Sequence, residues 1–225
     1  MEEIKVIEVN ENIFASNEKE ASKTREKLKK SKTFMLNVMS SPGSGKTTLL
    51  SALINKLKNE FRIVVFDVDI ETSLDATTVA KNTGVKSVQI HNAGLCHIDA
   101  DMTSRCLENI NIEDYDFIVL ENIGNLVCPA EFDTGACKNM MLLSVPEGDD
   151  KPLKYPLMFS VSDIVVFSKI DTKPIFDFDE EKCKERIKKL NKQAKFVSVS
   201  AKTGEGVDEL ASLLKQEINI WKKGE

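Results

Sequence analysis

Apolar and polar residues follow one another in blocks along this chain, and the blocks have the lengths of strands and helices. Short runs that are apolar at nearly every position predict strands buried on both faces. Longer segments with apolar residues every three or four positions predict helices with one buried stripe. The predicted strands are Phe34 to Met39, Arg62 to Asp67, Lys86 to Ile90, Asp116 to Glu121, Met140 to Val145, Asp163 to Ser168 and Lys195 to Val199. The predicted helices are Gly45 to Phe61, Thr72 to Asn82, Ile98 to Ile110, Glu180 to Asn191 and Val207 to Trp221.

The alternation of strands and helices predicts the fold class. Buried strands separated by helices are typical of a doubly wound α/β domain with a mostly parallel sheet. Residues 13–31 are polar and lysine-rich, with sparse apolar points at Ile13, Phe14, Ala21 and Leu28, and they predict an amphipathic helix. We therefore expect an N-terminal helical extension over residues 1–31 and the α/β domain over residues 32–225.

Residues 40–47 read Ser-Ser-Pro-Gly-Ser-Gly-Lys-Thr and lie between the first predicted strand and the following helix. This context predicts the phosphate-binding loop of a P-loop NTPase, in which backbone N–H groups and a helix N-terminus surround phosphate oxygens. We expect Lys46 to reach the β- and γ-phosphates and Thr47 to offer its hydroxyl to Mg²⁺. Ser40 stands where the usual pattern has glycine. The phosphate-binding residues expected from the loop are Pro42, Gly43, Ser44, Gly45, Lys46, Thr47 and Thr48.

Two later segments favour guanine over adenine as the base. Ser168-Lys169-Ile170-Asp171 follows a predicted strand and is similar to the Asn-Lys-x-Asp motif of GTPases, with serine in place of asparagine. The Asp171 carboxylate can accept hydrogen bonds from guanine N1–H and the N2 amino group, which adenine does not supply. Because Ser168 replaces the asparagine, it is an open question how this base-binding loop is held in place. The supporting base loop is expected at Ser200, Ala201 and Lys202.

Acidic residues at the ends of the second and fourth strands are the candidates for holding Mg²⁺ and for hydrolysis. Asp69 and Glu121 are expected to act with Lys46 in catalysis, and Thr47, Asp69, Asp75 and Glu121 are the candidate Mg²⁺ ligands. Because Mg²⁺ retains several waters, two of these oxygens suffice. For Asp67 and Asp75 the alternative is a helix cap or a solvated face.

Sulfur and imidazole groups form a second candidate site. Cys96 and His97 precede a predicted helix, and Cys128 follows the strand that carries Glu121, so the three side chains lie at ends of strands that can converge. Thiolate and imidazole suit Zn²⁺ or Ni²⁺. Asp99 can orient His97 or cap the next helix. Cys106 and Cys183 are expected to be packing residues, and Cys137 is left open.

Three segments together resemble the hydrogenase nickel-incorporation GTPases of the HypB type. They are the phosphate-binding loop, Cys96 to Ala100, and the stretch from Glu121 to Asp133, and the segment from Glu147 to Pro156 adds to the likeness. The resemblance implies slow GTP hydrolysis, nucleotide- or metal-dependent homodimers, and Ni²⁺ or Zn²⁺ held by Cys96, His97 and Cys128. It also implies that nickel passes to the hydrogenase large subunit together with a nickel-binding accessory protein.

Some positions depart from that family's pattern. Asp101 and Arg105 replace histidines that often follow Cys-His, and Val68 replaces a glycine. Two other functions are therefore considered beside nickel delivery to hydrogenase. The chain can be a related GTPase that serves another nickel or cofactor enzyme, as the urease-accessory proteins do. It can also be a metal-binding adaptor with weak nucleotide turnover. A P-loop kinase is disfavoured because arginine occurs only four times.

The composition and net charge of the chain argue against nucleic-acid and membrane partners. A net charge of −5, 41% hydrophobic and 30% charged residues are typical of a soluble globular protein without a nucleic-acid partner. Apolar runs stay well below the ~18 residues of a membrane span, and the first residues lack a signal pattern. Five cysteines, an odd number, indicate free thiols or metal ligands. We expect a cytoplasmic protein without a membrane partner.

Overall fold

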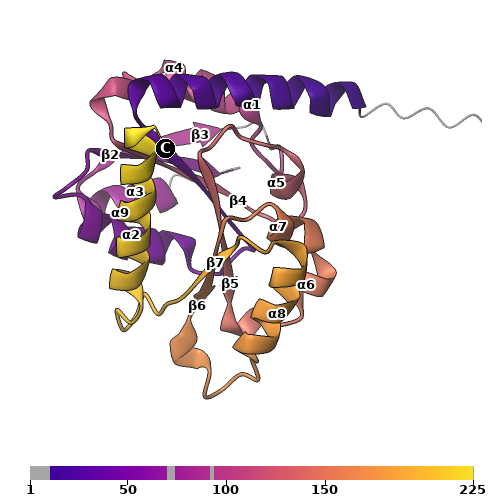
Figure 1. The fold of residues 1–225 in the computed structure, drawn as a ribbon. Coiled ribbons are helices and arrows are strands. Elements are labelled where there is room, and N and C mark those ends of the chain that lie inside the picture. Colours follow the sequence, from indigo (N-terminus) through magenta and orange to yellow (C-terminus); the bar gives the residue numbers. More distant parts are fainter. Residues whose placement is uncertain (1–10, 70–73, 92–93, 225) are drawn as a thin grey trace, which may run out of the picture.

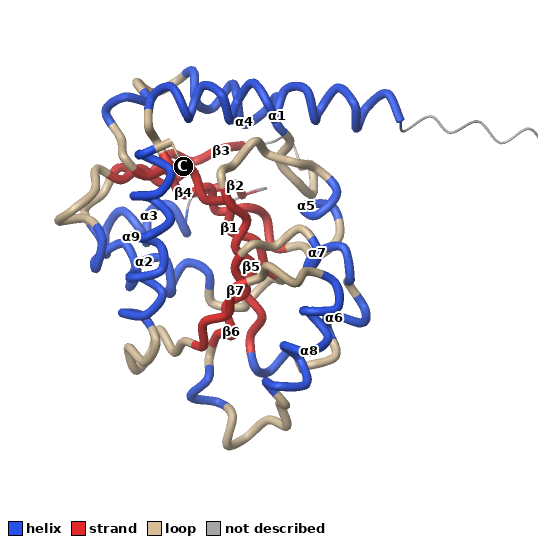
Figure 2. The backbone as a smooth tube through the Cα atoms, viewed as in Figure 1, coloured by secondary structure: helices blue, strands red, loops and turns tan. Residues whose placement is uncertain are grey.

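Seven parallel strands form the centre of the molecule. The computed structural model describes residues 11–69, 74–91 and 94–224. The strands are arranged in the order β3-β2-β4-β1-β5-β6-β7. Figure 2 shows them in red between the blue helices. Each neighbouring pair is parallel, which confirms the predicted doubly wound sheet. The strands are β1 (Phe34–Ser40), β2 (Ile63–Asp69), β3 (Lys86–His91), β4 (Phe117–Gly124), β5 (Lys138–Ser144), β6 (Ile164–Ser168) and β7 (Lys195–Ser198).

Helices cover both faces of the sheet (Figure 1). One face packs against α2, α3 and α9, and the other packs against α1, α4, α5, α7 and α8. The inner strands β1, β4, β5 and β6 are mostly buried and mostly apolar, as the sequence pattern predicted, whereas the edge strands β3 and β7 are only partly buried and carry more polar residues. The helices are α1 (Glu11–Ser31), α2 (Lys46–Leu57), α3 (Leu74–Thr83), α4 (Ala100–Glu108), α5 (Cys128–Glu131), α6 (Lys151–Lys154), α7 (Pro156–Ser160), α8 (Glu180–Leu190) and α9 (Val207–Lys223).

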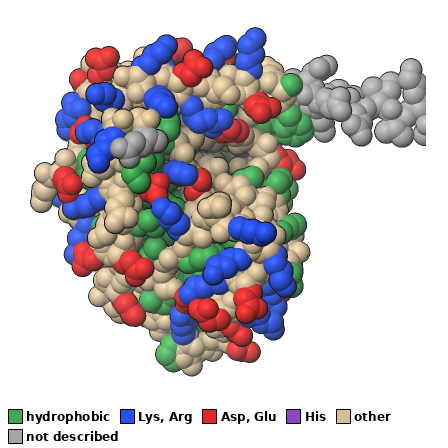
Figure 3. All heavy atoms as spheres, in the orientation of Figure 1, with side chains coloured by type: hydrophobic (Ala, Val, Ile, Leu, Met, Phe, Trp, Pro, Cys, Tyr) green, Lys and Arg blue, Asp and Glu red, His purple; other side chains and the backbone are tan. Residues whose placement is uncertain are grey.

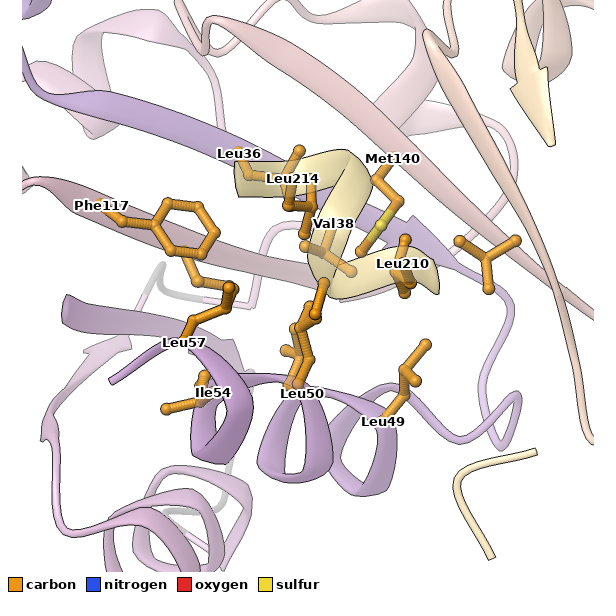
Figure 4. Packing of buried hydrophobic residues seen from close by; sticks show 14 of the residues in the cluster. Leu36, Val38, Leu49, Leu50, Ile54, Leu57, Phe117, Met140, Leu210 and Leu214 are labelled. Carbon is orange, nitrogen blue, oxygen red and sulfur yellow. The ribbon is translucent and has the colours of Figure 1, made fainter. Parts of the chain in front are cut away.

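The largest apolar cluster lies between β1, α2 and α9 (Figure 4). Leu36 and Val38 of β1 face Leu50 of α2 and Leu214 of α9, and all four side chains are fully buried. This packing fixes α2 against the central strand, so the loop that joins β1 to α2 is held at the carboxyl edge of the sheet. The predicted apolar stripe of α2 is buried throughout, at Leu49, Leu50, Leu53, Ile54 and Leu57.

Several element boundaries differ from the prediction. The helix expected to reach Phe61 ends at Leu57, because the N–H groups of Glu60 and Phe61 both donate to the Leu57 carbonyl and turn the chain toward β2. The helix expected from Ile98 begins at Ala100, where the Asp99 carboxylate accepts from Met102 N–H as an N-cap. The one-turn helices α5, α6 and α7 were not predicted, since four or five residues are too few for a periodic pattern.

Helix α1 confirms the predicted N-terminal helix. It lies along α4 and buries Ala21, Thr24 and Leu28 (Figure 1). The division of the chain at residue 31 stays a prediction. On the face seen in Figure 3, basic and acidic side chains are interspersed, in keeping with the modest net charge. Within the described ranges, each helix is too short or too polar to traverse a lipid bilayer.

Candidate functional site

The predicted phosphate-binding loop joins β1 to α2 and borders a cavity of about 640 Å³. Gly43 and Gly45 have φ angles of 73° and 96°, which side-chain-bearing residues adopt at a cost. Gly45 is the residue directly before α2, so the first N–H groups of that helix point into the loop. These donors and the helix dipole provide an anion-binding environment. The lining residues include Pro42, Gly43, Ser44, Gly45, Lys46, Thr47 and Thr48.

Polar side chains of the loop are held in place around this cavity. The Lys46 ammonium donates to Ser40 Oγ at 2.8 Å, so the serine that replaces glycine serves as an acceptor at the base of the loop. The Thr47 hydroxyl lies 3.2 Å from Glu121 Oε1 at the end of β4. A hydroxyl and a carboxylate side by side are the oxygen donors that a hard cation such as Mg²⁺ takes, so these residues fit that ion.

The acidic residues at the end of β2 and in the first turn of α3 divide into two groups. Asp67 Oδ2 accepts from Ala76 N–H at 2.9 Å in the first turn of α3, so its carboxylate holds that helix, and Asp67 also lines the phosphate cavity. The side chains of Asp69 and Asp75, both candidate Mg²⁺ ligands, lie outside the described part of the structure. Their roles stay predictions.

A second cavity, of about 320 Å³, adjoins the first and shares its wall at Ser44, Gly45, Thr48 and Lys169. The Asp171 carboxylate lines it and accepts from Ser200 Oγ at 2.7 Å, which orients the carboxylate. The remaining lining residues predicted from the base motifs are Ser168, Lys169, Ala201 and Lys202. The structure therefore brings the residues of both base motifs together beside the phosphate-binding loop.

The base motif is bound directly to the phosphate-binding loop. The Ser168 hydroxyl is buried and donates to the Ser44 carbonyl at 2.9 Å. The Lys169 ammonium donates to the Gly43 carbonyl at 2.7 Å. Serine at this position therefore forms a brace between the two loops.

Glu147 contacts the phosphate-binding loop, a role that the sequence did not predict. One of its oxygens accepts from the Ser41 hydroxyl of the phosphate-binding loop. The other accepts from Ser144 N–H at 2.9 Å and Ser144 Oγ at 2.6 Å in a capping box after β5. The Ser-x-x-Glu spacing of Ser144 and Glu147 was the available signal for the cap. Its contact with Ser41 joins residues 106 positions apart and required the fold.

The two predicted thiol ligands lie together. Cys96 Sγ in the loop before α4 is 2.8 Å from Cys128 Sγ at the start of α5, and both cysteines are free. Asn125 links the two segments, because its Nδ2 lies 3.4 Å from the Cys96 carbonyl and its Oδ1 accepts from Val127 N–H. Thiols this close are suited to hold a soft or borderline metal ion.

The imidazole of His97 lies beside the thiol pair. Its Nδ1 is 3.9 Å from Cys96 Sγ, and the ring stacks on Phe132 with a centroid distance of 3.9 Å. Burial lowers the pKa of His97, which favours the neutral form that binds metals. Across the described residues, three or more His, Cys, Asp or Glu side chains nowhere form a preassembled metal cage. In the described part of the chain, the two thiols therefore lie together with the imidazole beside them.

The other three cysteines lie elsewhere in the chain and are partly or fully buried. Burial raises the pKa of Cys106 to about 11 and that of Cys183 to about 12. Burial also raises the pKa of Cys137 to about 12, and its sulfur accepts from Met35 N–H. Their burial fits the packing role predicted for Cys106 and Cys183, and Cys137, which was left open, is in a similar environment. Asp99, whose two roles were left open, caps α4.

Comparison with known proteins agrees with this geometry. Residues 34–198 match the CobW/HypB/UreG nucleotide-binding domain. The hydrogenase maturation factor HypB of Azotobacter chroococcum is 38% identical over 213 residues, which span 95% of this chain and 70% of that protein. The hydrogenase/urease maturation factor HypB of Helicobacter pylori is 38% identical over 214 residues, which span 93% and 87%. This chain belongs to the HypB family.

Solved HypB structures share the fold described above. The crystal structure of Helicobacter pylori HypB in complex with nickel superimposes with a TM-score of 0.84 over 91% of this chain and 95% of that one, at 38% identity. HypB from Archaeoglobus fulgidus gives 0.83 over 91% and 99%, at 35% identity. The signal recognition particle receptor FtsY of Elizabethkingia anophelis, in complex with GDP, gives 0.54 at 13% identity and shares the fold alone. The HypB family thus accounts for the nucleotide-binding architecture of this chain.

Proposed function

We propose that this HypB-family chain is a GTP-hydrolysing metallochaperone that binds nickel and delivers it during maturation of [NiFe]-hydrogenase. One observation carries the proposal. The carboxyl end of β4 borders the phosphate cavity through Glu121 and Gly124, and the same segment reaches Cys128 four residues later. A change at the γ-phosphate therefore has a short covalent path to one thiol of the metal site. Such coupling is reciprocal, so nickel should alter nucleotide affinity.

The nucleotide half of the proposal assigns a role to each group. Lys46 stabilises charge on the β- and γ-phosphates, while Thr47, Glu121, Asp69 and Asp75 are the candidate ligands of Mg²⁺, which would neutralise phosphate charge when bound. Asp171 reads the guanine edge, and its carboxylate is already oriented by Ser200. Hydrolysis proceeds by in-line attack of water on the γ-phosphate, with positioning and charge stabilisation as the main contributions.

Nickel is the cargo of the metal half. Cys96 and Cys128 supply two thiolates, and His97 supplies the third ligand; Zn²⁺ suits the same donors. The open coordination position is the point at which a second subunit of a homodimer or a nickel-binding accessory protein engages the ion. The crystal structure of the related Helicobacter pylori HypB is a complex with nickel, which supports this choice of cargo.

Phosphate release from GTP and from ATP, measured with and without Ni²⁺, tests both halves. We expect GTP-selective turnover that Ni²⁺ alters. Lys46→Ala should abolish GTP binding and leave Ni²⁺ binding intact, whereas Cys96→Ala should remove Ni²⁺ and leave GTP binding intact. Cys106→Ala is the matched thiol control and should change neither. Full Ni²⁺ stoichiometry in Cys96→Ala would refute the metal assignment, and equal turnover of ATP would refute the base assignment.

The recipient enzyme has a second candidate. The relative from Helicobacter pylori is named a hydrogenase/urease maturation factor, so urease is an alternative recipient. Incubation of nickel-loaded protein with apo-hydrogenase large subunit or with apo-urease, together with the accessory proteins, separates the two. Activation of urease alone would reject hydrogenase as the recipient.

A further inference from the structure

Helix α1 contacts both segments that carry the thiols. The side-chain amide of Asn17 makes two hydrogen bonds to backbone groups that are far apart in sequence. Its Oδ1 accepts from Ala100 N–H at 2.9 Å, three residues after His97. Its Nδ2 donates to the Asp133 carbonyl at 3.0 Å, five residues after Cys128. Only the amide oxygen can accept and only the amide nitrogen can donate, so one side chain fixes both segments in a single orientation.

Two further contacts hold α1 on the segment that follows Cys128. Arg25 forms a bidentate ion pair with Asp133, with Nη1–Oδ1 and Nη2–Oδ2 distances of 2.8 and 2.7 Å. The planar fork of arginine gives this pair a defined geometry that a single contact lacks. Phe14 packs on Phe132 at 5.4 Å between ring centroids, and Phe132 stacks on His97. Contacts from α1 thus lead, through Phe132, to the imidazole beside the thiol pair.

These contacts lie apart from the nucleotide cavities. Among the described residues that line either cavity, none belongs to α1. The two thiols are 32 residues apart in the chain: Cys96 lies in the loop before α4, and Cys128 begins the one-turn helix α5. Two side-chain amides brace this spacing: Asn125 joins the segments from within the Cys128 segment, and Asn17 spans both of them from α1.

We propose that Asn17 is a positioning residue that sets the spacing between the Cys96–His97 segment and the Cys128 segment, and so determines nickel affinity. The inference rests on the proposed function, because it takes the thiol pair as the nickel site. Without the Asn17 amide, the two segments separate more freely, and nickel must order them when it binds. Mutation of a residue that orients metal ligands without binding the metal typically lowers metal affinity by about 10–100-fold. We therefore expect the Asn17 variants to bind nickel at least about tenfold more weakly than wild type.

Three variants of α1 test the proposal. Asn17→Ala removes both hydrogen bonds. Asn17→Asp has the same shape but retains only the acceptor toward Ala100 N–H. Ser22→Ala is the matched control, because Ser22 is exposed on the same helix and its hydroxyl donates to the Glu18 carbonyl within that helix. The Ni²⁺ dissociation constant is measured by competition with a chromophoric chelator, together with the thiolate-to-nickel charge-transfer absorption and the affinity for a fluorescent GDP analogue.

We expect Asn17→Ala and Asn17→Asp to weaken Ni²⁺ binding and to alter the charge-transfer absorption while GDP affinity stays at the wild-type value. Ser22→Ala should match wild type in each measurement. If Asn17→Ala also loses GDP binding, it has failed to fold, and the isosteric Asn17→Asp decides. Wild-type Ni²⁺ affinity and absorption in a folded Asn17 variant, while Cys96→Ala has lost nickel, overturn this inference alone. Retention of nickel by Cys96→Ala overturns the nickel site, and this inference with it.

Discussion

Gly206 and Gly204 lie in the same loop between β7 and α9, and replacing each by alanine should have very different effects. Both have left-handed backbones, with φ angles of 72° and 86°. An added Cβ at Gly206 would lie 1.9 Å from the Ser198 carbonyl oxygen, whereas one at Gly204 meets nothing within 4 Å. The two substitutions therefore carry the same conformational penalty and differ in steric overlap alone.

The structure sets the magnitude of each effect. The left-handed conformation costs an L-residue about 1–2 kcal/mol, and this is the whole expected loss for Gly204→Ala. An ordinary carbon–oxygen contact is about 3.3 Å, so Gly206→Ala must displace the end of β7 by about 1.4 Å. Backbone shifts forced by overpacking add about 1–3 kcal/mol, which gives a total loss of about 2–5 kcal/mol. That is a large share of the roughly 5–15 kcal/mol that stabilises a typical domain.

Urea unfolding followed by circular dichroism measures the free energy of unfolding of both variants. We expect Gly206→Ala to lose about 1–3 kcal/mol more than Gly204→Ala. Because Ser200 N–H bonds the Glu205 carbonyl in this loop, GDP affinity should also fall in Gly206→Ala. Equal losses in the two variants would refute the steric argument and leave only the backbone conformation as the cause.

Two further predictions concern ionisable groups. Burial raises the pKa of Glu180, but hydrogen bonds from Lys173 and Lys184 outweigh it and bring that pKa to about 2 from an ordinary 4.5. Its stabilising contribution is thus complete above pH 4.5 and disappears as the pH falls toward 2. In Glu180→Gln, the free energy of unfolding, measured with urea, should therefore fall less steeply between pH 4.5 and pH 2 than in wild type. An unchanged decrease would contradict the assignment. Cys183 is fully buried, and burial raises its pKa to about 12. Maleimide at pH 7 should therefore label exposed Cys96 first and Cys183 only on unfolding. Equal labelling rates of the two cysteines, measured by peptide mass spectrometry, would contradict this.

Much of the candidate site was readable from local sequence because its parts are short and contiguous. The loop from Ser40 to Thr47 and the segment from Ser168 to Asp171 each carry their own chemistry, and each follows an apolar run that predicts a buried strand. In a parallel sheet the carboxyl ends of strands share one edge, so these groups had to converge. Local pattern did not reveal Glu147 as an anchor of Ser41, nor that the Ser168 hydroxyl would brace the phosphate-binding loop.

The sequence by itself determined the strands, most of the helices, the phosphate-binding loop and the candidate thiol ligands, because periodicity and turn chemistry act over a few neighbouring residues. Tertiary structure alone decided that β4 lies between β1 and β2, which puts Cys128 beside Cys96. It also decided that Asn17, an ordinary polar residue on a helix, contacts backbone groups 83 and 116 positions away. Such contacts depend on strand order and helix placement, which result from burial of the whole apolar surface and leave no mark on any local stretch of sequence.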